Sequence, residues 1–151
     1  MKTTLTIISL ALALVSCQQE TVSVQTNTPT TPVGTVMMMN PSTFDATGQS
    51  LLYQGMFESA VHTTSGTVRV YEDKDKKRTL VFENFKTDAG PDLRIYLAED
   101  KSVSNFIQVT NEVKNGNSSV AIPVNANLQK QNYVLIWCKQ FSVLFGAAKL
   151  K

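Results

Sequence analysis

Two side chains of this sequence are best suited to chemistry, Cys138 and His62. The 151-residue chain contains two cysteines, Cys17 and Cys138, and His62 is its single histidine. A cysteine thiolate ligates iron or is oxidised to sulfenic acid, provided that it is accessible and lies near positive charge. An imidazole serves as an iron ligand or as the base that keeps a thiol ionised. Both residues are therefore candidates for redox chemistry or cofactor binding.

Each candidate also has a purely structural interpretation. A free cysteine is often a small buried hydrophobe, and Cys138 ends an apolar run. Strand alternation would turn Lys139 and Trp137 away from Cys138, which makes Lys139 a poor activator of the thiol. His62 would alternatively form a hydrogen bond within its own turn. Met56 is a third candidate ligand, although we expect it to pack in the core.

The remaining residues favour a protein that is not an enzyme, although the sequence leaves that question open. They form no Ser-His-Asp set, no catalytic carboxylate pair and no phosphate-binding loop. One histidine and two cysteines cannot build a four-ligand zinc site, so we predict no metal site. Asp88 and Asp92 flank a turn, but two carboxylates are too few to predict a cation site.

The first seventeen residues have the layout of a bacterial lipoprotein signal. Lys2 precedes an apolar run over residues 5–15, which is shorter than the roughly 20 residues needed to span a bilayer. The run leads into Leu14, Val15, Ser16 and Cys17, which look like the lipobox whose cysteine receives diacylglyceryl and palmitate chains. We expect cleavage before a lipidated Cys17. The alternative is an ordinary secretory signal with a chance cysteine.

Residues 18–41 are predicted to be a flexible tether. They are rich in Thr, Gln and Pro, and Glu20 is their single charge. Met37, Met38 and Met39 would bind Cu(I) as soft ligands or, as we expect, pack against the edge of the domain. The sequence thus predicts an envelope protein held to the membrane by the lipid on Cys17, on the periplasmic or the outer surface. With 14 basic and 12 acidic residues, the chain shows no charge bias that would favour nucleic acid.

Residues 42–151 are predicted to form a single all-β domain, either an antiparallel β-sandwich or a partly closed barrel. Alternation of apolar and polar residues predicts strands at 51–57, 67–71, 79–85, 93–97, 106–113, 119–124, 133–138 and 141–150. We expect the strands at 106–113 and 119–124 to pair as a hairpin around Asn115, Gly116 and Asn117. The continuous apolar run at 133–138 is typical of a central strand buried on both faces.

Four separated motifs in this region resemble the DM-thirteen domain. They are residues 55–57 with 60–68 (GMF and AVHTTSGTV), 80–85 (LVFENF), 90–97 (GPDLRIYL) and 134–148 (VLIWCKQFSVLFGAA). The motifs occur in the order that the family shows, and the resemblance covers residues 52–150. Members of this family occur in bacterial surface proteins and, in animals, beside DOMON domains.

The resemblance implies electron transfer, with Cys138 acting as a thiol or helping to hold a prosthetic group such as haem. His62 would be its partner, and a redox protein would be the natural binding partner. Any haem would be held non-covalently, because the sequence lacks Cys-x-x-Cys-His. The alternative function is a β-sandwich binding or adhesion module for a protein or a carbohydrate, in which Cys138 only packs.

Overall fold

The computed structural model describes residues 44–151, which form strands, turns and loops. The eight strands are β1 (Ser50–Ser59), β2 (Thr64–Glu72), β3 (Arg78–Thr87), β4 (Leu93–Ala98), β5 (Ile107–Thr110), β6 (Gly116–Ala121), β7 (Tyr133–Cys138) and β8 (Val143–Lys149). In this part of the chain, no helix has the length and apolar character needed to span a lipid bilayer. Each strand predicted from alternation is present; the bounds of β7 are those predicted, and the bounds of the other strands differ by up to three residues at an end.

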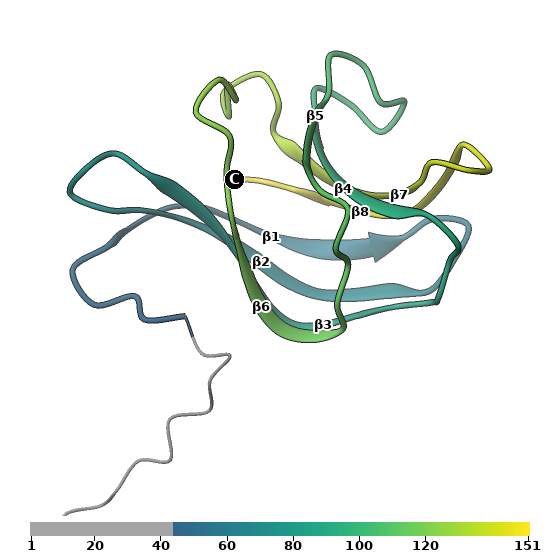
Figure 1. Cartoon of the computed structure of the whole chain (residues 1–151), viewed down its shortest axis with the longest axis horizontal. Coiled ribbons are helices and arrows are strands. Elements are labelled where there is room, and N and C mark those ends of the chain that lie inside the picture. The colour runs from purple at the N-terminus through teal and green to yellow at the C-terminus, as the bar shows by residue number, and fades with distance from the viewer. Residues whose placement is uncertain (1–43) are drawn as a thin grey trace, which may run out of the picture. The chain divides into compact units, whose positions relative to one another are not determined.

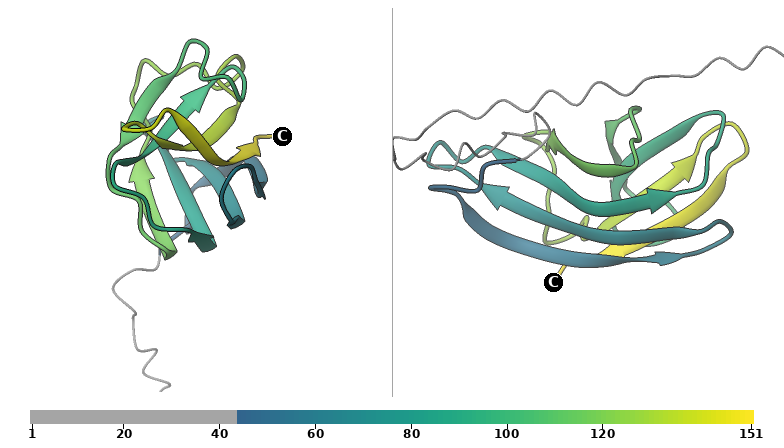
Figure 2. Two further views of the ribbon diagram at one scale, coloured as in Figure 1. Left: turned by 90° about the vertical axis from the view of Figure 1, so that its right-hand side faces the viewer. Right: turned by 90° about the horizontal axis from the view of Figure 1, so that it is seen from below.

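All eight strands belong to one antiparallel sheet, in the order β5-β4-β7-β8-β1-β2-β3-β6. The sheet curls until its two edge strands, β5 and β6, approach one another, so that it nearly closes into a barrel (Figures 1 and 2). Residues 111–115 join these two edges. The all-β prediction is confirmed, and the partly closed barrel describes the architecture.

The predicted hairpin between β5 and β6 is wrong. β5 pairs with β4, and β6 pairs with β3, on opposite edges of the sheet. The side chain of Asn115 provides the local reason, because it accepts a hydrogen bond from the backbone N–H of Thr87 (2.9 Å) and donates one to its carbonyl (3.1 Å). These contacts fix the start of β6 beside the end of β3. The Asn-Gly sequence therefore marks a crossing between two edges of the sheet.

Alternation in β2 and β3 separates the interior of the barrel from its outer face. Val68 and Val70 have no exposed surface, whereas Arg69 between them faces outward and forms an ion pair with Glu83 of β3. The interior is filled by apolar side chains from strands on both sides of the curled sheet, including the stacked rings of Phe57 and Phe82.

A second apolar cluster lies on the outer face of β4, β7 and β8. Leu135 and Tyr96 are buried there, beneath residues that include Val103 and Trp137. Phe106 stacks on Tyr96 with ring centroids 4.5 Å apart. β7 is therefore buried on both faces, as its continuous apolar run predicts.

Four connections meet at one end of the barrel, here called the His62 end. They are the β1–β2 turn (60–63), the β3–β4 loop (88–92), the β5–β6 loop (111–115) and the β7–β8 turn (139–142). The turns of β1–β2 and β7–β8 lie on the right in Figure 1. Phe44, the first described residue, packs on Tyr71 near the opposite end of β2, with ring centroids 5.1 Å apart.

Candidate functional site

Cys138 ends β7 with its side chain in the interior of the barrel. It has no exposed surface and belongs to the main core. Its direct neighbours in the sheet are Leu93 of β4 and Val143 of β8. Trp137 packs in the outer cluster, as alternation predicts. Lys139 is exposed, and its backbone N–H donates to the carbonyl of Asp92 at 2.9 Å.

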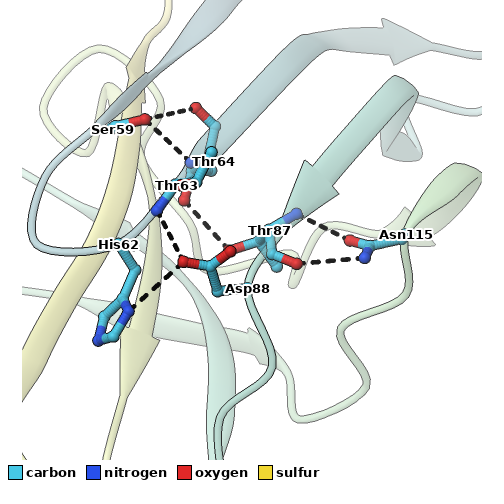
Figure 3. Close-up of polar contacts among 7 residues, drawn as sticks. All are labelled: Ser59, His62, Thr63, Thr64, Thr87, Asp88 and Asn115. Atoms are coloured by element: carbon cyan, nitrogen blue, oxygen red, sulfur yellow. Dashed lines mark hydrogen bonds and ion pairs between the residues drawn. The ribbon is translucent and has the colours of Figure 1, made fainter.

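His62 lies in the β1–β2 turn and is held by an aromatic ring and a carboxylate. Its ring lies over that of Phe145 with centroids 3.9 Å apart, and its Nδ1 is 3.5 Å from Oδ2 of Asp88 (Figure 3). The partner of His62 is therefore in the β3–β4 loop, and not in its own turn as one sequence interpretation had it. A carboxylate beside one ring nitrogen orients the imidazole and leaves Nε2 on the other side of the ring. The side chain is 41% exposed.

A network of polar contacts fixes the position of this turn (Figure 3). The carboxylate of Asp88 accepts the backbone N–H of Thr63 at 3.0 Å, and the N–H of Asp88 donates to the carbonyl of Thr63 at 3.2 Å. Thr64 is buried, and its hydroxyl is 3.1 Å from that of Thr87. The hydroxyl of Ser59 accepts the N–H of Thr64 at 3.0 Å and donates to its carbonyl at 3.1 Å. Together these bonds tie the β1–β2 turn to β3.

The structure brings Cys138 and His62 to the same end of the barrel, but it does not bring them into contact. Cys138 faces the packed interior, whereas His62 lies at the surface, over the outer side of the buried Phe145 ring. An iron atom bound to Cys138 would have to occupy space that the core side chains fill. The described residues therefore do not fit a haem that Cys138 and His62 would both ligate.

Asp88 and Asp92 line one surface cleft of about 400 Å³ between the β3–β4 and β5–β6 loops. Asp92 is engaged by Arg94, with Nε 2.6 Å from Oδ1 and a second guanidinium nitrogen 3.2 Å from Oδ2. This hydrogen bonding lowers the pKa of Asp92 below its usual value. Among residues 44–151, no group of three or more His, Cys, Asp and Glu side chains is arranged to hold a metal ion.

Two residues important to this site were missed by sequence reasoning. Phe145 was part of a predicted strand, and Asp88 was considered only as half of a weak cation site. An aromatic residue 83 positions after His62 gives no local signal that the two rings stack. Met56 differs from expectation in another way, because its side chain is 75% exposed instead of buried in the core. Cys17, Met37, Met38 and Met39 lie outside the described residues.

Comparison with known proteins supplies the family. The family model DM13, described as electron transfer DM13, matches residues 56–150. This match includes both His62 and Cys138. Searches of curated proteins and of solved structures found no match to the chain.

Proposed function

The chain belongs to the electron transfer DM13 family, and on that premise we propose that it is a lipid-anchored envelope protein that transfers electrons through the thiol of Cys138. The observation that carries the proposal is the family match over residues 56–150, which spans almost the whole barrel. Cys138 is the single cysteine of that region. Because the described residues do not fit a haem bound by Cys138 and His62, we assign the redox chemistry to the thiol itself.

The proposed chemistry is thiol–disulfide exchange with a redox partner protein. The thiolate of Cys138 attacks one sulfur of a disulfide on the partner, and the partner's S–S bond breaks as a new S–S bond to Cys138 forms. The other partner sulfur leaves as a thiolate and takes up the proton that Cys138 released. Cys138 is thereby oxidised, and the leaving sulfur is reduced. A thiolate of a second, electron-donating protein then attacks the partner sulfur of the mixed disulfide, which forms a disulfide between donor and partner and releases the thiolate of Cys138. Two electrons thereby pass from the donor thiol to the partner disulfide, and Cys138 returns to its reduced state.

Cys17 supplies the proposed membrane anchor, and residues 18–41 supply the tether. A flexible chain of this length has a root-mean-square span of about 25–30 Å, so the barrel would stay near the bilayer. Two or three acyl chains hold such a protein durably, whereas one chain binds only marginally. The described chain starts at Phe44, which lies at the end of the barrel opposite His62. The His62 end is the end of the barrel away from Phe44, and we propose that a partner binds there.

The test uses the full chain carrying Cys17→Ser, so that Cys138 is the sole cysteine. The folded protein is equilibrated with mixtures of reduced and oxidised glutathione, and adducts are counted by mass spectrometry. We expect one glutathione per chain, removed by excess reduced thiol, while the fold stays intact by circular dichroism. We expect no adduct when the Cys17→Ser chain also carries Cys138→Ala. A thiol that forms no reversible adduct under conditions that preserve the fold contradicts the proposal.

A binding or adhesion module is the second candidate, and the burial of Cys138 favours it. A thiol with no exposed surface suits a packing role. At the His62 end, Val61 and Phe141 are 71% and 62% exposed on the β1–β2 and β7–β8 turns. These turns adjoin, because the N–H of Val61 donates to the carbonyl of Leu144 at the start of β8. An inert thiol, together with unchanged cell-surface behaviour of Cys138→Ala, would select this function instead.

A further inference from the structure

The residues beside Cys138 show how its thiol is enclosed. Leu93 and Val143 lie directly opposite Cys138 on β4 and β8, on the same inner face. Phe145 is two residues beyond Val143 and also faces inward. Residues in this diagonal relation are within reach of an aromatic side chain. Cys138 is therefore flanked by Leu93 on one side and by Val143 and Phe145 on the other.

Gly90 closes the barrel above these side chains. A Cβ atom at this position would lie 2.7 Å from Cδ2 of Leu93 and 2.9 Å from Cζ of Phe145. The ends of the Leu93 and Phe145 side chains thus converge beneath the backbone of Gly90. Because these are the two large neighbours of Cys138 at the His62 end, the β3–β4 loop covers the thiol.

The cleft of about 400 Å³ lies directly outside this cover. Leu93 lines the cleft and is also the cross-strand neighbour of Cys138. Val113, from the β5–β6 loop, lines the same cleft and packs against the main core. Solvent in the cleft is therefore separated from the thiol by the side chain of Leu93, which makes this the short route to Cys138.

The β3–β4 loop is attached at both of its ends by contacts that can be broken individually. At the β3 end, Asp88 binds the backbone of Thr63 and the imidazole of His62. At the β4 end, the carbonyl of Asp92 accepts the N–H of Lys139. Between them lie Ala89 and Pro91, both exposed. Loss of the Asp88 side-chain contacts loosens the β3 end of the loop, while the contact at Asp92 and the ladders of the strands on either side remain.

We propose that residues 88–92 form a lid over Cys138, and that the thiol is reached through the cleft when the lid and Leu93 move together. The inference rests on the proposed thiol chemistry for its biological meaning, but the lid itself concerns only how reagents reach the thiol of Cys138. The Asp88 contacts act as its latch. Local opening of this kind exposes little surface, so it depends only weakly on denaturant, unlike global unfolding.

The test measures how fast Cys138 reacts in the full chain carrying Cys17→Ser. The probe is dithiobisnitrobenzoate, an aromatic disulfide that releases one coloured thiolate for each thiol that it modifies. Rates are followed at several low denaturant concentrations. For the wild-type barrel we expect slow labelling that changes little with denaturant at first. Labelling that follows the unfolding equilibrium at every concentration would overturn the lid.

Two pairs of variants separate the lid from general destabilisation. Leu93→Ala removes the wall between cleft and thiol, and Leu128→Ala removes a buried leucine of the same core that lies beside Glu72 and Arg78 at the other end. Asp88→Ala removes the side-chain contacts of the latch, to the N–H of Thr63 and to His62, and keeps the backbone bond. Its control is Asp73→Ala, because the Asp73 carboxylate likewise accepts backbone N–H groups, those of Asp75 and Lys77, in the turn between β2 and β3.

We expect Leu93→Ala and Asp88→Ala to label at least about tenfold faster than their controls after each rate is compared at equal global stability. Equal rates within both pairs would overturn the proposal. Asp88→Ala leaves the core side chains in place, so it still decides the matter if Leu93→Ala fails to fold. Fast labelling without reversible glutathione exchange would keep the lid and remove the redox function. Reversible glutathione exchange, with no effect of either variant on the labelling rate, would keep the redox function and remove the lid.

Discussion

The imidazole of His62 covers the ring of Phe145 at a centroid separation of 3.9 Å, with the two planes inclined by 31°. Phe145 has no partner in the register between β7 and β8, which shifts from Trp137–Leu144 to Ile136–Gly146. The Phe145 side chain points inward, where it joins the core that contains Cys138. This single contact therefore connects the β1–β2 turn at the surface to the ring beside the buried thiol.

Replacing His62 by Ala should lower the free energy of unfolding by about 0.5–1.5 kcal/mol, the usual worth of an aromatic pair. The matched variant is His62→Phe, which keeps a ring over Phe145 but removes Nδ1 from Asp88. We expect His62→Phe to lose clearly less stability than His62→Ala in urea denaturation. If both variants lose the same amount, the imidazole–Asp88 contact, and not the stacking, holds the turn.

Gly66 should be the glycine least tolerant of substitution among those with positive φ. Its φ is +110°, and a Cβ there would lie 2.6 Å from the Cα of Phe85. Gly116 has a φ of +98° but nothing within 4 Å of the same position. Gly116→Ala therefore adds only backbone strain, of about 1–2 kcal/mol, whereas Gly66→Ala also adds a clash between strands. Melting temperatures of the two variants test this, and equal losses would contradict the crowding at Gly66.

The pairing of β5 and β6 shows what sequence patterning cannot predict. Alternation predicts the strands and the buried faces of β2 and β7 correctly, because burial of Val68, Val70 and Leu135 follows from local sequence. It fails for β5 and β6, whose partners depend on the Asn115 side chain reaching Thr87 across 28 positions. Local turn chemistry describes the bend at Asn115 but contains no information on which strand lies beside it.

The candidate site could likewise be predicted from the sequence only in part. Its two reactive residues follow from residue type and family motif, and the outward direction of Trp137 follows from alternation. The contacts made by His62 do not follow from the local sequence, because Asp88 lies in the β3–β4 loop and Phe145 lies in β8. The complete burial of Cys138 depends on the closure of the barrel end, about which the local sequence contains no information.

The Asp92–Arg94 pair should make stability depend on pH in a defined window. Hydrogen bonding to Arg94 holds the pKa of folded Asp92 below its ordinary value of 3.8. A carboxyl with a depressed folded pKa stabilises the protein above its unfolded pKa, and this contribution disappears as pH falls through the folded pKa. The stability advantage of wild type over Asp92→Asn should thus be full at neutral pH and shrink below about pH 4. Arg94→Gln should remove the same pH-dependent part, and a wild-type advantage that is constant between neutral and acid pH would contradict the assignment.

Membrane attachment should depend on the sulfur of Cys17. If the lipobox is processed as proposed, the wild-type chain fractionates with membranes and leaves them only in detergent, because two or three acyl chains bind durably. Cys17→Ser blocks acylation and should move the exported protein to the soluble fraction. Cys138→Ser is the matched control, since it changes the other cysteine and should leave fractionation unaltered. Labelling cells with radioactive palmitate adds a direct measurement, in which the label should be lost with Cys17→Ser and kept with Cys138→Ser. A Cys17→Ser chain that stays on the membrane would show that something other than lipid holds it, and the tether would then need another anchor.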